Sequence, residues 1–285
     1  MTTEKNQTLT YNEVLHRASS FLEKNNHSVF AAEWLMRERL NWTKTDLVRN
    51  FREEMPADQV KQFNQDVKKF NDGMPMQHIV GHEWFYTRQF KVTNDTLIPR
   101  PETEEWLDRV LKMLPEKPLN VLDIGTGTGV LAITEKKERP EDFVTATDLS
   151  KEALQVASQN AKDLQADVTF KQGDLFAPVE NETFDVILSN PPYIGLDELN
   201  VMDQSVIDYE PKLALFAEDD GYHIYNRLAQ SIANHLNPEA QIFLEIGYTQ
   251  GKRVAETFKK ALPQARVEIW QDFNGLDRVV AIYCE

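Results

Sequence analysis

Four consecutive residues, Asn190-Pro191-Pro192-Tyr193, combine a carboxamide, two residues that lack an N–H donor and an aromatic ring. The Asn190 side chain offers a carbonyl oxygen that can accept a hydrogen bond. A proline holds the preceding residue extended and removes its own backbone donor, so the carbonyls here can face a ligand. The Tyr193 ring can stack on a flat group. We expect this tetrapeptide to hold an –NH2 group attached to a planar system.

A glycine-rich loop lies about 60 residues earlier in the chain, after a run of strand-forming residues. Its residues are Gly125, Thr126, Gly127, Thr128 and Gly129. Glycines let the backbone turn sharply and let a ligand lie against it. The spacing is G-x-G-x-G, whereas a dinucleotide-binding loop is G-x-G-x-x-G and places a pyrophosphate on a helix N-terminus. The loop therefore suits a cofactor without a pyrophosphate, such as a nucleoside that carries an amino acid.

Three acidic residues accompany the loop. Asp123 precedes it on the strand, and Asp148 ends the next predicted strand, where a carboxylate can accept hydrogen bonds from both hydroxyls of a ribose. Asp174 follows the third strand and is placed to accept from an adenine amino group. The alternative for Asp174 is a loop acid or a helix cap.

These parts together favour transfer of a methyl group to a planar nitrogen. Such a nitrogen is a poor nucleophile because its lone pair is delocalised. Alignment of that lone pair with a sulfonium methyl group can contribute up to about 7–11 kcal/mol of the barrier. Hydrogen bonds accepted from the nitrogen also favour the positive charge that it develops. A separate strong base is not required if the proton leaves after the transfer.

The elements that must position these residues alternate regularly from residue 119 onward. Strands separated by helices predict a mainly parallel sheet with both faces covered. The last two strands are joined by a segment with the turn pair Asn274-Gly275, so a terminal antiparallel hairpin is expected. The seven predicted strands are Leu119–Ile124, Phe143–Asp148, Asp167–Gln172, Phe184–Ser189, Gln241–Ile246, Arg266–Gln271 and Arg278–Tyr283.

Three domains are predicted. Residues 1–73 show helical spacing of apolar residues and form a small helical bundle, and residues 74–100 form a β-hairpin linker with a turn signal at residues 93–95. Residues 101–285 form the α/β domain, which begins with a helix at Pro101. The helix after the glycine loop carries four consecutive charges at residues 135–138, so we expect it to be short or exposed to solvent.

The charge of the chain disfavours nucleic acid as a partner. The net charge is −15, and residues 1–73 contain 11 basic and 11 acidic residues, so the whole excess lies after them. Proteins that grip nucleic-acid backbones usually present a basic face. A single cysteine, Cys284, allows no internal disulfide and no cysteine metal cage, so we expect no metal. The chain shows neither a signal peptide nor a membrane span, which predicts a cytoplasmic protein.

At this point the sequence resembles the peptide chain release factor glutamine methyltransferases. The resemblance covers nearly the whole chain and extends beyond the two motifs. It includes residues 75–103, Tyr209-Glu210-Pro211 followed by Asp220-Gly221, Leu244-Glu245-Ile246-Gly247, and Asp272, Gly275 and Asp277-Arg278-Val279.

The resemblance implies a Rossmann-like class I methyltransferase fold and S-adenosylmethionine as cofactor. The implied substrate is the glutamine of the Gly-Gly-Gln motif in class I release factors, methylated on its side-chain nitrogen. The glycine loop and Asp148 would hold the cofactor, with Asp123, Asp174 and Leu175 beside it. Some relatives have an aromatic residue at the position of Leu175. The leucine weakens the expectation that a side chain stacks on the adenine here. Asn190 through Tyr193 would hold the glutamine, with Asn190 also near the donor methyl.

Three alternatives remain open. An amino-methyltransferase acting on adenine or guanine in DNA or RNA would use the same tetrapeptide, because the exocyclic –NH2 of a base is also planar. A nicotinamide-dependent oxidoreductase is disfavoured by the glycine spacing, and a non-catalytic module by the intact tetrapeptide. We expect the helical domain 1–73 to dock the protein substrate.

Overall fold

The computed structural model describes residues 9–195, 199 and 202–285. They form two compact units. The first contains the chain up to Gly81 together with helix α9 (Gln204–Tyr209), and the second contains His82–Asp203 and Glu210–Glu285. The segment 74–100 is thereby divided, since its helix belongs to the first unit and its hairpin to the second.

The first unit is helical, as the spacing of its apolar residues predicts. Its buried core is formed by residues such as Leu22, Leu35, Met36 and Phe63. Two helices begin with reciprocal capping boxes, in which a threonine and an acidic residue three positions later satisfy each other's backbone N–H groups. The helices are α1 (Tyr11–Lys24), α2 (Phe30–Leu40), α3 (Lys44–Asn50), α4 (Ala57–Asn71) and α5 (Met76–Val80).

The second unit contains a seven-stranded sheet in the order β5-β4-β3-β6-β7-β9-β8. The five strands from β5 to β7 are parallel, and β9 runs antiparallel to both of its neighbours. The predicted fold class, with its terminal antiparallel hairpin, is confirmed. The strands are β3 (Asn120–Ile124), β4 (Phe143–Asp148), β5 (Val168–Gln172), β6 (Phe184–Ser189), β7 (Leu236–Glu245), β8 (Arg266–Gln271) and β9 (Asp277–Tyr283).

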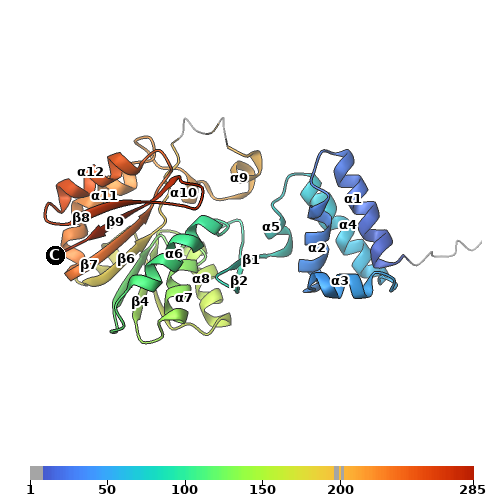
Figure 1. Ribbon diagram of the computed structural model, residues 1–285, viewed down its shortest axis with the longest axis horizontal. Coiled ribbons are helices and arrows are strands. Elements are labelled where there is room, and N and C mark those ends of the chain that lie inside the picture. The colour runs from blue at the N-terminus through green and yellow to red at the C-terminus, as the bar shows by residue number, and fades with distance from the viewer. Residues whose placement is uncertain (1–8, 196–198, 200–201) are drawn as a thin grey trace, which may run out of the picture. The chain divides into compact units, whose positions relative to one another are not determined.

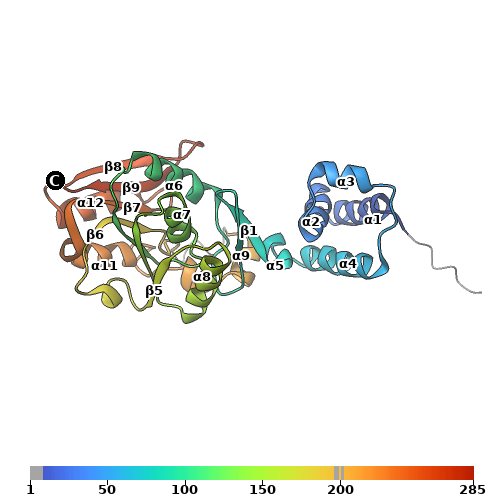
Figure 2. The same ribbon diagram turned by 90° about the horizontal axis from the view of Figure 1, so that it is seen from below.

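Helices cover both faces of this sheet because its central strands are apolar on both sides. Neighbouring residues of β3 illustrate this: Val121 belongs to one buried cluster and Leu122 to the other. Figure 1 shows α11 and α12 on the opposite side of the sheet from α6 and α7. Figure 2 views the sheet from the side on which α6, α7 and α8 lie. The helices are α6 (Pro101–Met113), α7 (Val130–Glu138), α8 (Lys151–Asp163), α10 (Lys212–Leu215), α11 (His223–Ser231) and α12 (Gly251–Ala261), with short 3-10 turns at Ala177–Val179 and Ile232–His235.

The predicted hairpin exists, but its turn is not at residues 93–95. Strands β1 (His82–Phe85) and β2 (Arg88–Lys91) are joined by Tyr86 and Thr87, whose φ angles are 48° and 62°. Such a turn usually requires glycine or asparagine, so the sequence gives no signal for it. Contacts with α6 hold it: the Tyr86 N–H donates to Glu104 (2.8 Å), and the Tyr86 hydroxyl donates to Asp108 (2.9 Å).

Helix α7 is short, with nine residues, but the alternative expectation of a solvent-facing helix is wrong. Its residues from Val130 to Glu135 are all buried. Glu135 is fully buried near Arg139 (Nε to Oε1, 3.7 Å) and Asp142. Burial and the neighbouring carboxyl of Asp142 raise the pKa of Glu135 to about 9, which favours its protonated form at neutral pH.

Candidate active site

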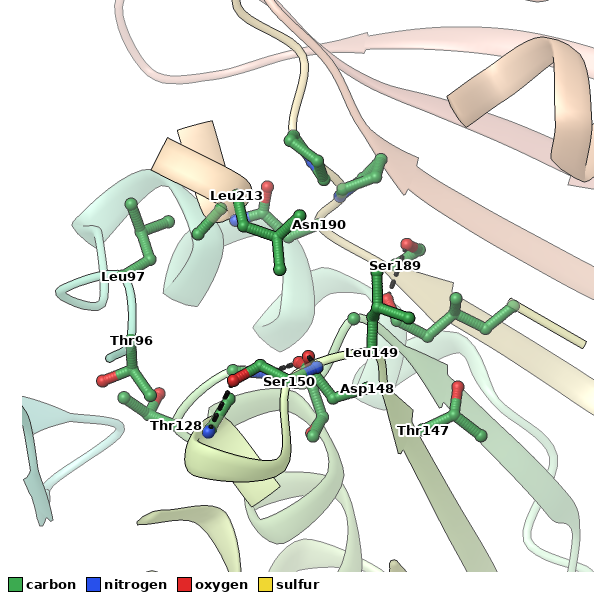
Figure 3. Close-up of a pocket in the computed structure, with 18 of the residues that line it drawn as sticks. Thr96, Leu97, Thr128, Thr147, Asp148, Leu149, Ser150, Ser189, Asn190 and Leu213 are labelled. Atoms are coloured by element: carbon green, nitrogen blue, oxygen red, sulfur yellow. Dashed lines mark hydrogen bonds between the residues drawn. The ribbon is translucent and has the colours of Figure 1, made fainter. Parts of the chain in front are cut away.

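A cavity of about 210 Å³ opens where β3, β4 and β6 end, and all of its lining residues belong to the second unit. Parallel sheets bind ligands at the carboxyl ends of their strands. The lining brings together the glycine loop after β3, the β4 end at Asp148 and the β6 end at Asn190 (Figure 3). The sequence motifs that are far apart in the chain therefore face one space.

The glycine loop is tied to the neighbouring strand β4. The N–H groups of Gly125 and Thr126 donate to the Thr147 carbonyl at 2.9 and 3.0 Å. A Cβ built on Gly127 would meet nothing within 4 Å, and Gly127 lines the cavity, so a side chain there would project into the ligand space. A Cβ on Gly129 would instead lie 2.7 Å from Ile133 Cδ1, so that glycine permits packing beneath the loop.

Asp123 lies behind the loop and is not part of the cavity lining. Its Oδ2 accepts from the Thr126 hydroxyl (2.6 Å) and the Ala132 N–H (3.3 Å). The carboxyl is fully buried, and this burial raises its pKa to about 7. Asp123 thus fixes the shape of the loop from beneath.

Asp148 lies at the cavity, as predicted, and connects the loop to the start of α8. Its Oδ2 accepts from the Gly127 N–H (2.9 Å), and its Oδ1 accepts from the Ser150 N–H (2.8 Å). Burial raises the pKa of Asp148, and the hydrogen bonds from these N–H groups oppose that shift. Each carboxylate oxygen keeps a second lone pair, which allows a vicinal pair of hydroxyls to bind.

Asp174 also lines the cavity, but it is shared with a partner that the sequence did not reveal. Arg227 of α11 donates to both of its carboxylate oxygens, at 3.1 and 2.6 Å. An adenine amino group would use a remaining lone pair of this carboxylate. Leu175 lines the cavity next to it, with a φ of 49°, and supplies an apolar wall.

The tetrapeptide divides at the cavity. Asn190, Pro191 and Pro192 line it, whereas Tyr193 is absent from the lining. Tyr193 packs against the core cluster of α11 and α12, and its carbonyl accepts from Gln250 Nε2 (2.8 Å). Burial, reinforced by the Glu245 carboxylate, raises the pKa of Tyr193. Tyr193 is therefore packed on this core cluster and is not one of the residues that line the cavity.

Two functional features of the site were missed by sequence reasoning. The first is Glu210, whose side chain accepts from the Ile98 N–H (3.1 Å) and from Arg100 Nη2 (2.6 Å). It ties the segment 95–100 to the segment after Pro211, and both segments line the cavity. The Tyr-Glu-Pro stretch was noted as a motif, but its partners lie more than 100 residues away in the chain.

The second is a buried network beside Asn190, whose member Thr103 also lines the cavity. Its Nδ2 donates to Thr103 Oγ1 (3.3 Å), and the Thr103 hydroxyl donates to Glu245 Oε2 (2.6 Å). Trp106 Nε1 donates to the same oxygen (2.8 Å). These residues come from α6 and the end of β7, so only the folded chain brings them together.

Comparisons with known proteins show the class and the fold of this chain. A family model described as "Methyltransferase small domain" matches residues 108–208, and one described as "PrmC N-terminal domain" matches residues 13–81. A crystal structure of a methyltransferase from Pyrococcus furiosus has a TM-score of 0.53 at 21% identity, over 70% of this chain and 89% of that one. This likeness shows the fold. The fold and the site define a class I methyltransferase that uses S-adenosylmethionine.

Two curated relatives identify the family. The release factor glutamine methyltransferase of Enterococcus faecalis is 43% identical over 269 residues, covering 94% of this chain and 97% of the relative. The one from Staphylococcus aureus is 38% identical over 275 residues, covering 96% and 99%. The chain belongs to the release factor glutamine methyltransferase family.

The cavity fits the cofactor of this family. The open space above Gly127 and the paired oxygens of Asp148 suit a nucleoside with two ribose hydroxyls. Within residues 9–195, 199 and 202–285, no cluster of three or more His, Cys, Asp or Glu side chains is arranged to bind a metal ion. In the same part of the chain, none of the helices combines the length and hydrophobicity that a bilayer span demands.

Proposed function

We propose that this protein transfers a methyl group from S-adenosylmethionine to the side-chain amide nitrogen of the glutamine in the Gly-Gly-Gln motif of class I peptide chain release factors, and so modulates translation termination. The observation that carries the proposal is that Asn190-Pro191-Pro192 lines the same cavity as the glycine loop and Asp148. The names of the curated relatives support the choice of substrate.

The residues that would hold the cofactor are Gly125 to Thr128, Asp148, Asp174 and Leu175, with Asp123 and Gly129 shaping the loop from below. When bound, S-adenosylmethionine supplies an electrophilic methyl group on a sulfonium centre. The loop backbone leaves room for the ligand, and Asp148 binds the ribose hydroxyls. Leu175 and the exposed side chain of Leu149 provide apolar walls for the base.

The glutamine amide would be held by Asn190 and the prolines that follow it. The Asn190 Oδ1 and a backbone carbonyl of the tetrapeptide would accept the two amide N–H groups, which fixes the plane of the amide and the direction of the nitrogen lone pair. The described lining contains the aspartates Asp95, Asp148 and Asp174 but no histidine, lysine, cysteine or glutamate. This agrees with a mechanism in which alignment of the amide nitrogen with the methyl group lowers the barrier, and the proton leaves the nitrogen after the transfer.

The test is the kinetics of Asn190→Ala with a whole release factor as substrate. We expect turnover to fall by a factor of about 100 or more, since an acceptor aimed at a developing charge typically contributes on the order of 10²–10³. Binding of S-adenosylmethionine, measured by calorimetry, should change less than about threefold. Turnover equal to that of the native protein would remove Asn190 from the site.

The helical unit is proposed to dock the body of the release factor. Its surface exposes large apolar side chains, among them the adjacent residues Val29 (37% exposed) and Phe30 (74%), which a partner could cover. Phe30→Ser should raise KM for the whole release factor several-fold and leave KM for a short Gly-Gly-Gln peptide unchanged. Phe143→Ser, which alters an equally exposed residue (69%) of the second unit, is the matched control. Equal behaviour of the two variants would refute the docking role.

The cytoplasm is the proposed location, and nucleic acid is not a proposed partner. The net charge of −15 opposes binding to a phosphate backbone. Filter binding at low salt tests this point: tight, sequence-tolerant binding of RNA or DNA would favour a base methyltransferase instead.

A further inference from the structure

The network beside Asn190 determines which end of its carboxamide faces the cavity. Thr103 is 2% exposed and Glu245 is 1% exposed, so water does not supply alternative partners for either side chain. The network therefore has to satisfy its own donors and acceptors.

The proton positions follow from the chemistry of the groups. An indole N–H is a donor only, so Glu245 Oε2, which receives Trp106 Nε1, must be an acceptor. Burial raises the pKa of Glu245, and a proton on this carboxyl is favoured on Oε1, because a carbonyl oxygen accepts two hydrogen bonds better than a hydroxyl oxygen does. With Glu245 ionised or protonated on Oε1, the Thr103 hydroxyl, 2.6 Å from Oε2, gives its single proton to that oxygen.

Thr103 then has only lone pairs to offer to Asn190. The group of Asn190 that faces Thr103 Oγ1 must be the –NH2, as the 3.3 Å contact from Nδ2 has it. The carbonyl oxygen Oδ1 is at the opposite end of the amide. If the amide turned over, two acceptor oxygens would face each other in a buried place, which costs about 1–3 kcal/mol in free energy for an unsatisfied group.

We propose that Thr103 and Glu245 are positioning residues that lock the Asn190 carboxamide with Oδ1 toward the substrate, and that this lock selects a carboxamide over a carboxylate. This inference rests on the proposed function. A glutamine –NH2 donates to Oδ1, whereas a glutamate carboxylate has no proton to donate and meets an acceptor. The site therefore discriminates glutamine from glutamate through the orientation of the Asn190 amide.

The test uses Thr103→Val, which keeps the shape of the side chain and removes its lone pairs. Without them the amide can turn its –NH2 toward the cavity. Once the two orientations are about equal in free energy, the competent one falls to about half of the molecules, so we expect kcat for a Gly-Gly-Gln peptide to fall about twofold or more. The Kd for S-adenosylmethionine should stay within about twofold. Thr103→Ser keeps the hydroxyl and should restore most of the rate.

A second readout separates the lock from a structural role. A Gly-Gly-Glu peptide is measured as a competitive inhibitor, and its Ki is compared with that of the Gly-Gly-Gln peptide. The native protein should prefer the glutamine peptide by about tenfold or more, and Thr103→Val should reduce this preference several-fold. Glu245→Gln should preserve the preference, because Trp106 requires the new carbonyl oxygen at the position of Oε2, where Thr103 can still donate to it.

Thr134→Val is the matched control. Thr134 is a fully buried helical threonine in α7, and its hydroxyl makes no hydrogen bond within the described residues. This variant should show native kcat and native peptide preference. If native protein methylates the peptide and Thr103→Val leaves both kcat and the peptide preference unchanged, the lock is refuted. If native protein fails to methylate the peptide or a whole release factor, the proposed function fails first.

Discussion

Replacing Gly127 or Gly129 by alanine should separate the two tasks of the cofactor loop. Both glycines have positive φ angles, 55° and 84°, which cost an L-residue roughly 1–2 kcal/mol. Alanine also lowers the conformational entropy of the unfolded chain, which stabilises the folded state by about 0.4–1 kcal/mol. The backbone contribution is therefore small and nearly equal at the two positions.

The surroundings of the added methyl group differ. At Gly127 the methyl meets nothing within 4 Å, so Gly127→Ala should lose no more than about 1.6 kcal/mol of stability. At Gly129 it lies 2.7 Å from Ile133 Cδ1 and 3.2 Å from Ala157 Cβ. Overpacking of this kind costs about 1–3 kcal/mol. Gly129→Ala should therefore lose about 1–4.6 kcal/mol, a decrease in Tm of roughly 2–18 °C for a unit of this size.

Cofactor binding should show the reverse order. The methyl group of Gly127→Ala projects into the cavity, so the Kd for S-adenosylmethionine should rise by a factor of about 10 or more, as it does when a close ligand contact is blocked. Folded Gly129→Ala, measured below its Tm, should bind within a few-fold of the native protein. Calorimetry and thermal melts check both quantities. Native affinity in Gly127→Ala, or equal Tm values for the two variants, would refute this division of roles.

Two further predictions concern buried carboxyl groups. Glu210→Ala should lower the free energy of unfolding by about 2–3 kcal/mol in chemical denaturation, because it leaves the half-buried Arg100 without its partner. The control is Arg49→Ala, which breaks the ion pair with Asp46. Because the Arg49 side chain is 74% exposed, this variant should change stability by less than about 0.5 kcal/mol. The pKa of Glu135 is 4.5 in the unfolded chain and about 9 in the folded protein. The protonated side chain therefore contributes its full share of the free energy of unfolding below pH 4.5, and this share is lost as the pH rises toward 9. Glu135→Gln should flatten the fall in stability between pH 5 and pH 9, and Glu141→Gln, an exposed neighbour, should leave it unaltered; equal pH profiles for these two variants would contradict the assignment.

The sheet could be predicted because each strand carries its own signal. Runs of β-branched and apolar residues, separated by helical stretches, gave the seven strands to within one or two residues, except that β7 begins at Leu236 and not at Gln241. The glycine loop and Asp148 could be placed together because parallel strands end at one edge of the sheet. Local sequence was sufficient for these features.

The remaining features depend on contacts between distant residues. Thr103 and Glu245 are 142 positions apart, and Ile98 and Glu210 are 112 apart, so no local pattern links them. The turn at Tyr86 and Thr87 lacks the usual residue types and is held by α6. Glu135 is charged in the sequence but lies in the core beside Arg139. In each case, tertiary partners outweighed the local preference.

Methylation of the Gly-Gly-Gln glutamine is measured most directly by tandem mass spectrometry of a class I release factor after incubation with S-adenosylmethionine and this protein. The peptide that contains the motif should become heavier by one methylene group, with the added mass on the glutamine side chain, and Asn190→Ala should form this product more slowly by a factor of about 100 or more. A peptide of unchanged mass after treatment with cofactor-binding native protein, or a methyl group on another residue, would contradict the proposed activity.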